Sequence, residues 1–476
     1  MSIQSVIKSI QDIMRKDAGV DGDAQRLSQL VWLLFLKIFD DREKQYELID
    51  IKYKSPLSNE LRWRNWAQNP EGMTGDDLLD FINNKLFKKL KGLAFTEKDD
   101  PRGFIVKEVF EDTYNYMKSG TLIRQVINKI NEIDFNRQED KHHFNEIYEH
   151  LLKELQSAGN SGEYYTPRPL TKFVVEMVNP KLGEIILDPS CGTGGFLVSA
   201  LEQIRNSGEI KTAKDEKLLQ SSICGVELKP LPHLLAITNM ILHGVETPQQ
   251  IKRDDMLSRP LREYGPKDRV DVIVANPPFG GVVKDGTEAN FPASFRTKST
   301  ADLFLVLFMQ LLKPNGRAGI ILPDGSLFGE GVITAIKQKL LEEFNLHTIV
   351  RLPPGVFSPY AGVNTNLLFF EKGKPTKEVW YYQMPLPEGL RQYTKGRPIK
   401  DEEFEAVKKW FQKRAENEYA WKISIEEIKS RNYNLDFKNP NKKDYIAHKL
   451  PEEILKGLMG REGEIVEILS DVKKML

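Results

Sequence analysis

Residues 186–200 read ILDPSCGTGGFLVSA, a short apolar run, an acidic residue, a glycine-rich turn and an amphipathic segment. This order predicts a β-strand, a tight turn and an α-helix. Gly192, Gly194 and Gly195 let the backbone approach a ligand at the helix N-terminus, as in nucleotide-binding βαβ units. The stretch matches neither GxGxxG nor GxxxxGK[ST], which disfavours an NAD site and an ATPase phosphate loop. The alternative is a plain structural turn, and Asp188 at the strand end counts against it.

The surrounding residues, 156–380, alternate short β-branched runs with helical stretches, which predicts an α/β domain with a mostly parallel sheet covered on both faces. The candidate strands are EIILDP (184–189), SICGVEL (222–228), VDVIVANPP (270–278), GRAGIILP (316–323), HTIVRLP (347–353) and NLLFFEK (366–372).

Two further regions flank this domain. Residues 1–155 carry apolar residues at three- and four-residue spacing, which predicts an N-terminal helical domain that ends at the linker-like SAGNSGE (157–163). Residues 381–476 are polar and mixed, and they end in an amphipathic helical tail with an apolar stripe at Ile465, Leu469, Val472 and Met475. Such a stripe either docks on its own domain or binds a partner, and we favour the partner.

Composition sets the class of protein. The chain has 476 residues, too many for one ordinary core, and its net charge is +0. No apolar run is long enough for a membrane span, and no secretory signal begins the chain. Cys191 and Cys224 are the two cysteines, so we expect a cytoplasmic protein without a disulfide framework or a structural metal site. Because the charges balance, binding to nucleic acid would need a local patch or a partner.

Polar residues end several of the predicted strands. Glu227 closes one of them, at a place where an acidic residue commonly accepts hydrogen bonds from ribose hydroxyls. In KRDDML (252–257), Asp255 or Asp254 is a candidate acceptor for an adenine amine, and we choose Asp255 because an apolar residue follows it. NPPF (276–279) follows VDVIVA. If that strand neighbours EIIL in parallel, Asp188 and Asn276 emerge side by side at the topological switch point, where ligands bind.

With GEYYTPRPL (162–170) and NTNLLFFEK (364–372), these motifs resemble S-adenosylmethionine-dependent DNA adenine-N6 methyltransferases of the NPP[FY] type. Within that family the chain looks most like the modification subunit of type I restriction-modification systems. The resemblance covers nearly the whole chain, although protein-glutamine and RNA methyltransferases share tetrapeptides similar to NPPF. It implies a Rossmann-like, seven-stranded, mostly parallel sheet whose last strand, supplied by NLLFFEK, is antiparallel.

The resemblance also implies a cofactor site for S-adenosyl-L-methionine. Residues 163–168 would close over its methionine end, Asp188 and the turn 193–195 would hold its amino-acid portion, Glu227 its ribose and Asp255 its adenine. The individual residues are Glu163, Tyr164, Tyr165, Thr166, Pro167, Arg168, Asp188, Thr193, Gly194, Gly195, Glu227 and Asp255. The chain departs from the family pattern in two modest ways. Cys191 stands where the family usually has a small residue in the glycine-rich turn, and RDDML (253–257) matches only loosely the family motif that contains the adenine-binding aspartate.

The predicted catalytic residues are Asn276, Pro277, Pro278 and Phe279. An exocyclic adenine amine is a poor nucleophile because its lone pair is delocalised into the ring. Acceptors at the Asn276 side chain and the Pro277 carbonyl would favour a pyramidal nitrogen, and the prolines would fix the direction of that carbonyl. Phe279 would stack on a target base that has left the duplex. We interpret 280–300, with Phe291 and several cations, as a DNA-contacting segment, against a plain surface loop.

The expected partners follow from what the chain lacks. Double-stranded DNA is the implied substrate, yet no target-recognition module remains, so sequence choice would come from a separate specificity subunit. Family resemblance suggests two modification subunits per specificity subunit, and an ATP-dependent restriction subunit is a further candidate partner. Two alternatives stay open: an N-methyltransferase acting on RNA or on a protein glutamine amide, and a non-catalytic DNA-binding scaffold, against which the intact motifs argue.

Overall fold

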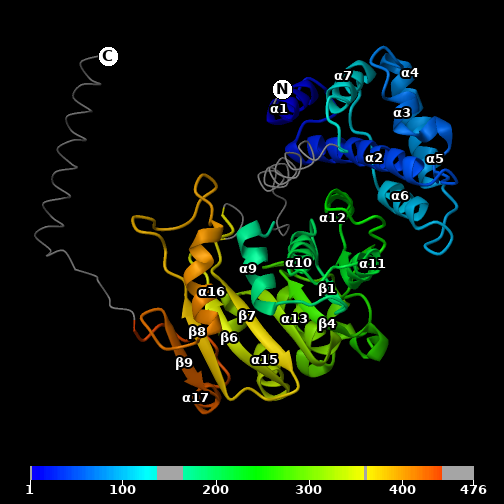
Figure 1. The fold of residues 1–476 in the computed structure, drawn as a ribbon. Coiled ribbons are helices and arrows are strands. Elements are labelled where there is room, and N and C mark those ends of the chain that lie inside the picture. Colours follow the sequence, from blue (N-terminus) through cyan, green and yellow to red (C-terminus); the bar gives the residue numbers. More distant parts are fainter. Residues whose placement is uncertain (1–2, 137–164, 359–361, 442–476) are drawn as a thin grey trace, which may run out of the picture.

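The computed structural model describes residues 3–136, 165–358 and 362–441. The N-terminal region is helical, as its periodicity predicts, and Figure 1 shows it in blue and cyan beside the sheet. Its helices are α1 (Ile3–Met14), α2 (Asp23–Ile49), α3 (Trp63–Trp66), α4 (Gly75–Asp80), α5 (Phe87–Lys91), α6 (Pro101–Glu111) and α7 (Gly120–Ile130). The expected boundary at 155, and the terminal apolar stripe at 465–475, lie outside the described residues.

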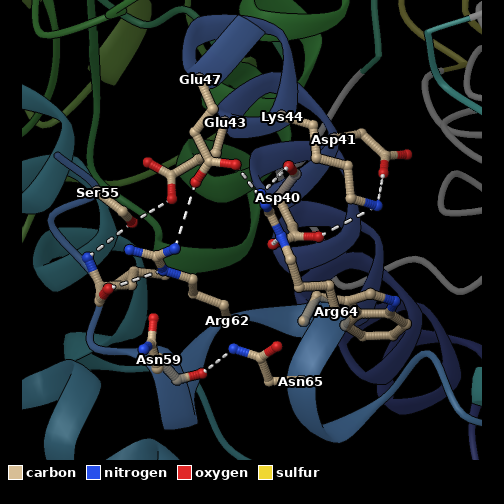
Figure 2. A network of polar contacts seen from close by, with 12 residues as sticks. Asp40, Asp41, Glu43, Lys44, Glu47, Ser55, Asn59, Arg62, Arg64 and Asn65 are labelled. Carbon is tan, nitrogen blue, oxygen red and sulfur yellow. Dashed lines mark hydrogen bonds and ion pairs between the residues drawn. The ribbon is translucent and has the colours of Figure 1, made fainter. Parts of the chain in front are cut away.

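Buried charges on α2 hold this region together (Figure 2). Asp40, Asp41 and Glu43 are each 2% exposed or less. Arg64 donates from Nε to Asp40 Oδ1 at 2.8 Å, and Lys37 pairs with Asp41. Burial raises the pKa of Glu43. Since buried charges are costly unless they are paired, this network ties the chain after α2 back onto the helix. The sequence pattern of α2 alone did not predict it.

Within the described residues, the sheet has nine strands in the order β3-β2-β1-β4-β5-β7-β6-β8-β9. They are β1 (Ile186–Asp188), β2 (Ile223–Glu227), β3 (Ile251–Arg253), β4 (Val270–Ala275), β5 (Leu312–Pro323), β6 (Phe344–Arg351), β7 (Thr365–Lys372), β8 (Glu378–Gln383) and β9 (Ala420–Ser424). Strand β7, which contains NLLFFEK, is antiparallel to both β5 and β6, as expected.

The strand count departs from the expected seven, although the α/β class is confirmed. Strand β8 pairs in parallel with β6, and β9 pairs antiparallel with β8, so the chain after β7 extends the sheet. The expected domain boundary at residue 380 falls within β8. The polar composition of the following residues hid this extension, which covers the hydrogen-bonding edge that β6 would otherwise expose.

Helices cover both faces of the sheet (Figure 1). Buried side chains of α9 (Arg168–Val178), α10 (Gly195–Asn206), α11 (Ala213–Ser222), α12 (Pro230–Leu242) and α16 (Glu405–Gln412) share one core. Those of α13 (Thr300–Leu311), α14 (Asp324–Phe328), α15 (Val332–Glu343) and α17 (Ile425–Ser430) share a second core. Successive residues of β4 alternate between the two: Val272 and Val274 join the first, Ile273 and Ala275 the second.

The helical region packs on the sheet domain through α2 and α12. Arg42 donates from Nη2 to the Ile241 carbonyl at 3.2 Å, and Arg253, the last residue of β3, pairs with Asp112 at 2.6 Å. The domain contact therefore reaches the end of a strand that borders the predicted cofactor site. Among the helices of 3–136, 165–358 and 362–441, none has the length and apolarity needed to cross a membrane.

Candidate active site

The candidate site lies at the carboxyl ends of β3, β2, β1 and β4, which are adjacent and parallel. Asp188 ends β1, Glu227 ends β2 and Asn276 directly follows β4. From β1 the chain turns into α10 on one face, whereas from β4 it leads to α13 on the other. The gap between β1 and β4 is thus the topological switch point, where ligands bind in open α/β sheets. The predicted pairing of EIIL with VDVIVA is confirmed.

The glycine-rich turn is tied to the end of β2. Cys191 donates its N–H to the Val226 carbonyl at 2.9 Å, and Gly192 donates its N–H to Glu227 Oε2 at 2.9 Å. Gly192 has φ 53° and Gly194 has φ 79°, values that disfavour other residue types. A side-chain carbon added at Gly192 would meet no atom within 4 Å. The glycine therefore serves the backbone conformation and leaves the ligand side of the turn open.

Asp188 is the most unusual carboxyl group of the site. It is 2% exposed and accepts a hydrogen bond from the Ser190 N–H at 3.1 Å. Burial raises the pKa of Asp188 well above its usual range, and the nearby Glu227 raises it further. Among the described residues, no basic side chain acts on the Asp188 carboxyl group. A buried carboxylate without a cation favours a positively charged ligand group.

Two polar side chains hold the turn from outside it. Asn239, fully buried on α12, donates from Nδ2 to the Thr193 carbonyl at 2.9 Å. Arg168 donates from Nη1 to the Gly195 carbonyl at 2.8 Å, so this guanidinium anchors the start of α10. The sequence interpretation missed Asn239. The available signal was a single amide within the apolar run LLAITNMIL (234–242).

The catalytic loop presents a buried acceptor. Asn276 donates from Nδ2 to Thr166 Oγ1 at 2.8 Å, while its Oδ1 is buried without a hydrogen-bond partner among the described residues. An unsatisfied buried acceptor costs about 1–3 kcal/mol, and a donor group of a bound molecule at the end of β4 would remove that cost. Pro277 is buried and Pro278 is half-buried, which keeps the loop rigid. The pair Thr166–Asn276 brings the segment before α9 against the end of β4.

Two aromatic residues differ from the sequence interpretation. Phe279 is 3% exposed and packs edge-on against Phe357, with ring centroids 5.8 Å apart, so the ring predicted to stack on a base is covered in this conformation. Phe291 is also 3% exposed and belongs to the second core, so this ring does not lie on the surface of the segment 280–300 that is predicted to contact DNA. The loop folds into short helical turns at Thr287–Asn290 and Ala293–Phe295, the second of which packs on α15, and the Phe291 side chain between them joins the second core.

The remaining predicted cofactor residues are placed as follows. Glu163 and Tyr164 lie outside the described residues, and Tyr165 is buried. Asp255 Oδ1 accepts from the Leu257 N–H at 3.0 Å, and Asp254 Oδ1 accepts from the Asp255 N–H at 2.8 Å. Both aspartates thus shape the turn after β3. In the described part of the chain, no three His, Cys, Asp or Glu side chains gather in a way that could hold a metal ion.

Comparisons with known proteins agree along the whole chain. Residues 139–449 match the family model described as N-6 DNA Methylase, and residues 3–130 match the HsdM N-terminal domain. The EcoEI methylase subunit of a type I restriction enzyme from Escherichia coli is 55% identical over 483 residues, which cover 100% of this chain and 98% of the relative.

Solved structures give the same assignment. A modification subunit from Vibrio vulnificus YJ016 superposes with a TM-score of 0.84 at 44% identity, covering 94% of this chain and 98% of the other. A chain from a type I restriction-modification assembly gives 0.82 at 38% identity, covering 100% and 98%. The chain therefore belongs to the N-6 DNA methylase family, among the methylase subunits of type I restriction enzymes.

Proposed function

We propose that this chain transfers a methyl group from S-adenosylmethionine to the N6 amine of an adenine extruded from duplex DNA. The observation that carries the proposal is the buried Oδ1 of Asn276 at the end of β4, which has no hydrogen-bond partner among the described residues. It stands one strand away from the Asp188 turn, so a base and a cofactor would meet at the switch point.

The residues present fit S-adenosylmethionine. Asp188 is buried, has no cationic partner in the part of the chain that the structure describes, and suits the amino group of the methionine portion. The open side of Gly192 leaves room for close approach to the backbone, and the buried Ser190 hydroxyl has no partner among the described residues. The turn Thr193-Gly194-Gly195 would complete that cradle, Glu227 would take the ribose hydroxyls, and Asp255 the adenine amine.

In this proposal the segment before α9 has two roles: some of its residues contact the cofactor, and Arg168 holds the turn that contacts it. Tyr165 and Pro167 would line the methionine end, with Glu163 and Tyr164 contributing from residues outside the description. Arg168 would act through the Gly195 carbonyl that it already holds.

The reaction requires the protein mainly to hold the adenine amine in the correct position and orientation for attack on the methyl group. When bound, S-adenosylmethionine supplies a methyl group activated by a sulfonium. Asn276 Oδ1 and the Pro277 carbonyl accept hydrogen bonds from the two N–H groups of the adenine amine, which favours a pyramidal nitrogen with a localised lone pair. No strong base is needed, because the nitrogen would become acidic once the methyl group has moved from the sulfonium to it, and its proton would then pass to water. Because two prolines follow Asn276, the carbonyl keeps its direction without reorganisation during the reaction.

Sequence choice would come from a partner. The chain carries a net charge of +0, and its full length resembles modification subunits rather than a self-contained methyltransferase with a recognition domain. We propose two copies of this chain per specificity subunit on duplex DNA, with an ATP-dependent restriction subunit as a further component. A solved relative comes from work on the assembly of a type I restriction-modification system, which supports the presence of partner subunits.

The test is the substitution Asn276→Ala. We expect methyl transfer from radiolabelled S-adenosylmethionine to duplex DNA without N6-methyladenine to fall by about 100- to 1,000-fold. Cofactor affinity, measured by calorimetry, should not change, because Asn276 contacts the amine. The control is Asn65→Ala, an exposed asparagine of the helical region. Normal turnover of Asn276→Ala would refute the mechanism, and methylation of RNA or of a protein glutamine in place of DNA would refute the substrate.

A further inference from the structure

One short segment touches both motifs of the site. In residues 165–168, which lead into α9, Thr166 Oγ1 accepts from Asn276 Nδ2 at 2.8 Å. Two residues later, Arg168 Nη1 donates to the Gly195 carbonyl at 2.8 Å. The segment therefore spans from the start of α10, after the glycine-rich turn, to the catalytic loop. A hydrogen bond between residues 110 positions apart in the sequence fixes the catalytic end of this span.

The segment is stiff enough to hold a fixed position. Pro167 has φ −52°, and its carbonyl accepts from the N–H groups of Leu170 at 2.9 Å and Thr171 at 3.1 Å. The residue before a proline is confined to extended conformations, so the backbone of Thr166 has little freedom. Thr171 Oγ1 also lies 2.8 Å from Ser199 Oγ on α10. The hydroxyl of Thr166 is thus held by a backbone anchored to the core.

An asparagine amide can face a neighbour with its oxygen or with its NH₂ group, and its other contacts decide which. The target amine donates two N–H groups, so it needs an acceptor. If Asn276 presented its NH₂ group, a donor would face a donor and the amine would stay planar. A hydroxyl can accept or donate, so its chemistry alone does not select the oxygen or the nitrogen of the amide. In the structure Thr166 Oγ1 accepts from Nδ2, and Oδ1 is the atom without a partner among the described residues.

We propose that Thr166 is a positioning residue for methyl transfer, whose hydroxyl holds the Asn276 amide with its oxygen toward the target amine. This inference rests on the proposed role of Asn276. It also differs from the sequence expectation for Thr166, which was a contact with the methionine end of the cofactor. The same segment holds the turn that forms the cofactor cradle, so cofactor site and acceptor are aligned by four consecutive residues.

The test compares Thr166→Val, which keeps the shape and removes the hydroxyl, with Thr166→Ser, which keeps the hydroxyl. Both are measured in the full chain assembled with its specificity subunit, on duplex DNA that lacks N6-methyladenine. We expect Thr166→Val to lower kcat by about 10- to 100-fold, with KM for S-adenosylmethionine changed by less than about twofold. Thr166→Ser should restore most of the turnover.

Two further variants sharpen the test. Thr113→Val is the matched control, a half-buried threonine of the helical region whose hydroxyl donates to the Val109 carbonyl, and it should keep wild-type kcat. In an Asn276→Ala background, Thr166→Val should cause almost no additional loss, because the hydroxyl acts through that amide. Such non-additivity marks two residues that work as one unit.

The possible outcomes distinguish a failure of the proposed role of Thr166 from a failure of the proposed role of Asn276. If Thr166→Val raises KM for the cofactor and leaves kcat intact, Thr166 contacts the cofactor, and the inference fails while the role of Asn276 stands. Equal losses in Thr166→Val and Thr166→Ser, or a loss that persists in the Asn276→Ala background, also overturn it. If Asn276→Ala itself turns over normally, the proposed function fails first.

Discussion

Affinity for S-adenosylmethionine should rise with pH until Asp188 is ionised, and it should fall again where the amino group of the cofactor, with an ordinary pKa of about 7.7–8.0, loses its proton. The carboxyl is 2% exposed, and burial together with Glu227 raises its pKa well above the usual range. Below that raised pKa the group carries a proton, which must leave before the carboxylate can pair with the cationic amino group. Each pH unit below the pKa therefore weakens binding by about tenfold, or about 1.4 kcal/mol, and binding releases a proton.

The neutral variant Asp188→Asn sets the size of the effect. It has the same shape, so it keeps the fold and removes a charge-assisted hydrogen bond of about 1.5–3 kcal/mol. At pH values above the raised pKa of Asp188, the variant should bind the cofactor roughly 10- to 100-fold more weakly than the wild type, with no pH dependence from this residue.

The stability of the chain without cofactor should change with pH in the opposite direction to the cofactor affinity. The folded-state pKa of Asp188 is raised, so the folded chain without cofactor loses stability as pH rises from the unfolded pKa to the folded one. Asp188→Asn removes this loss and should make the cofactor-free chain more stable at neutral pH than the wild type. Thermal unfolding without cofactor measures this directly.

Calorimetry between about pH 5 and pH 8.5, in two buffers with different ionisation enthalpies, counts the protons released on binding. The reasoning predicts up to one proton for the wild type at the acid end and a smaller number for Asp188→Asn. Equal pH profiles for the two proteins, or equal affinities above the pKa, would show that Asp188 does not meet the cationic group.

Two predictions concern other parts of the molecule. Arg124 is 5% exposed and donates hydrogen bonds to the carbonyls of Trp66, Ala67, Asn69 and Met73. The substitution Arg124→Ala should therefore lower the free energy of unfolding of the helical region by about 3 kcal/mol, as measured by urea denaturation. A change below about 1 kcal/mol would contradict this prediction. The purified chain alone should bind duplex DNA weakly and without sequence preference in a fluorescence titration, whereas tight, specific binding would argue against a separate specificity subunit.

Local sequence patterns were sufficient for much of the fold. The strand, turn and helix of residues 186–200 could be predicted because apolar alternation, an acidic strand end and closely spaced glycines are short-range signals. The antiparallel direction of NLLFFEK came from the family resemblance, and the adjacency of Asp188 and Asn276 was predicted on the condition that β1 and β4 pair in parallel; both are confirmed. The extension by β8 and β9 was missed because it depends on an edge that forms only after β6 is in place.

What the chain alone determined is therefore which chemical groups stand at the ends of which strands: Asp188, Glu227 and Asn276. What only the tertiary structure decided is how those groups are oriented. Thr166 meets Asn276 across 110 residues and Asn239 meets Thr193 across 46, while Phe279 is covered by Phe357. The physical reason is that a polar side chain takes its partner from whatever packing brings within 3 Å, and periodicity carries no information about that choice.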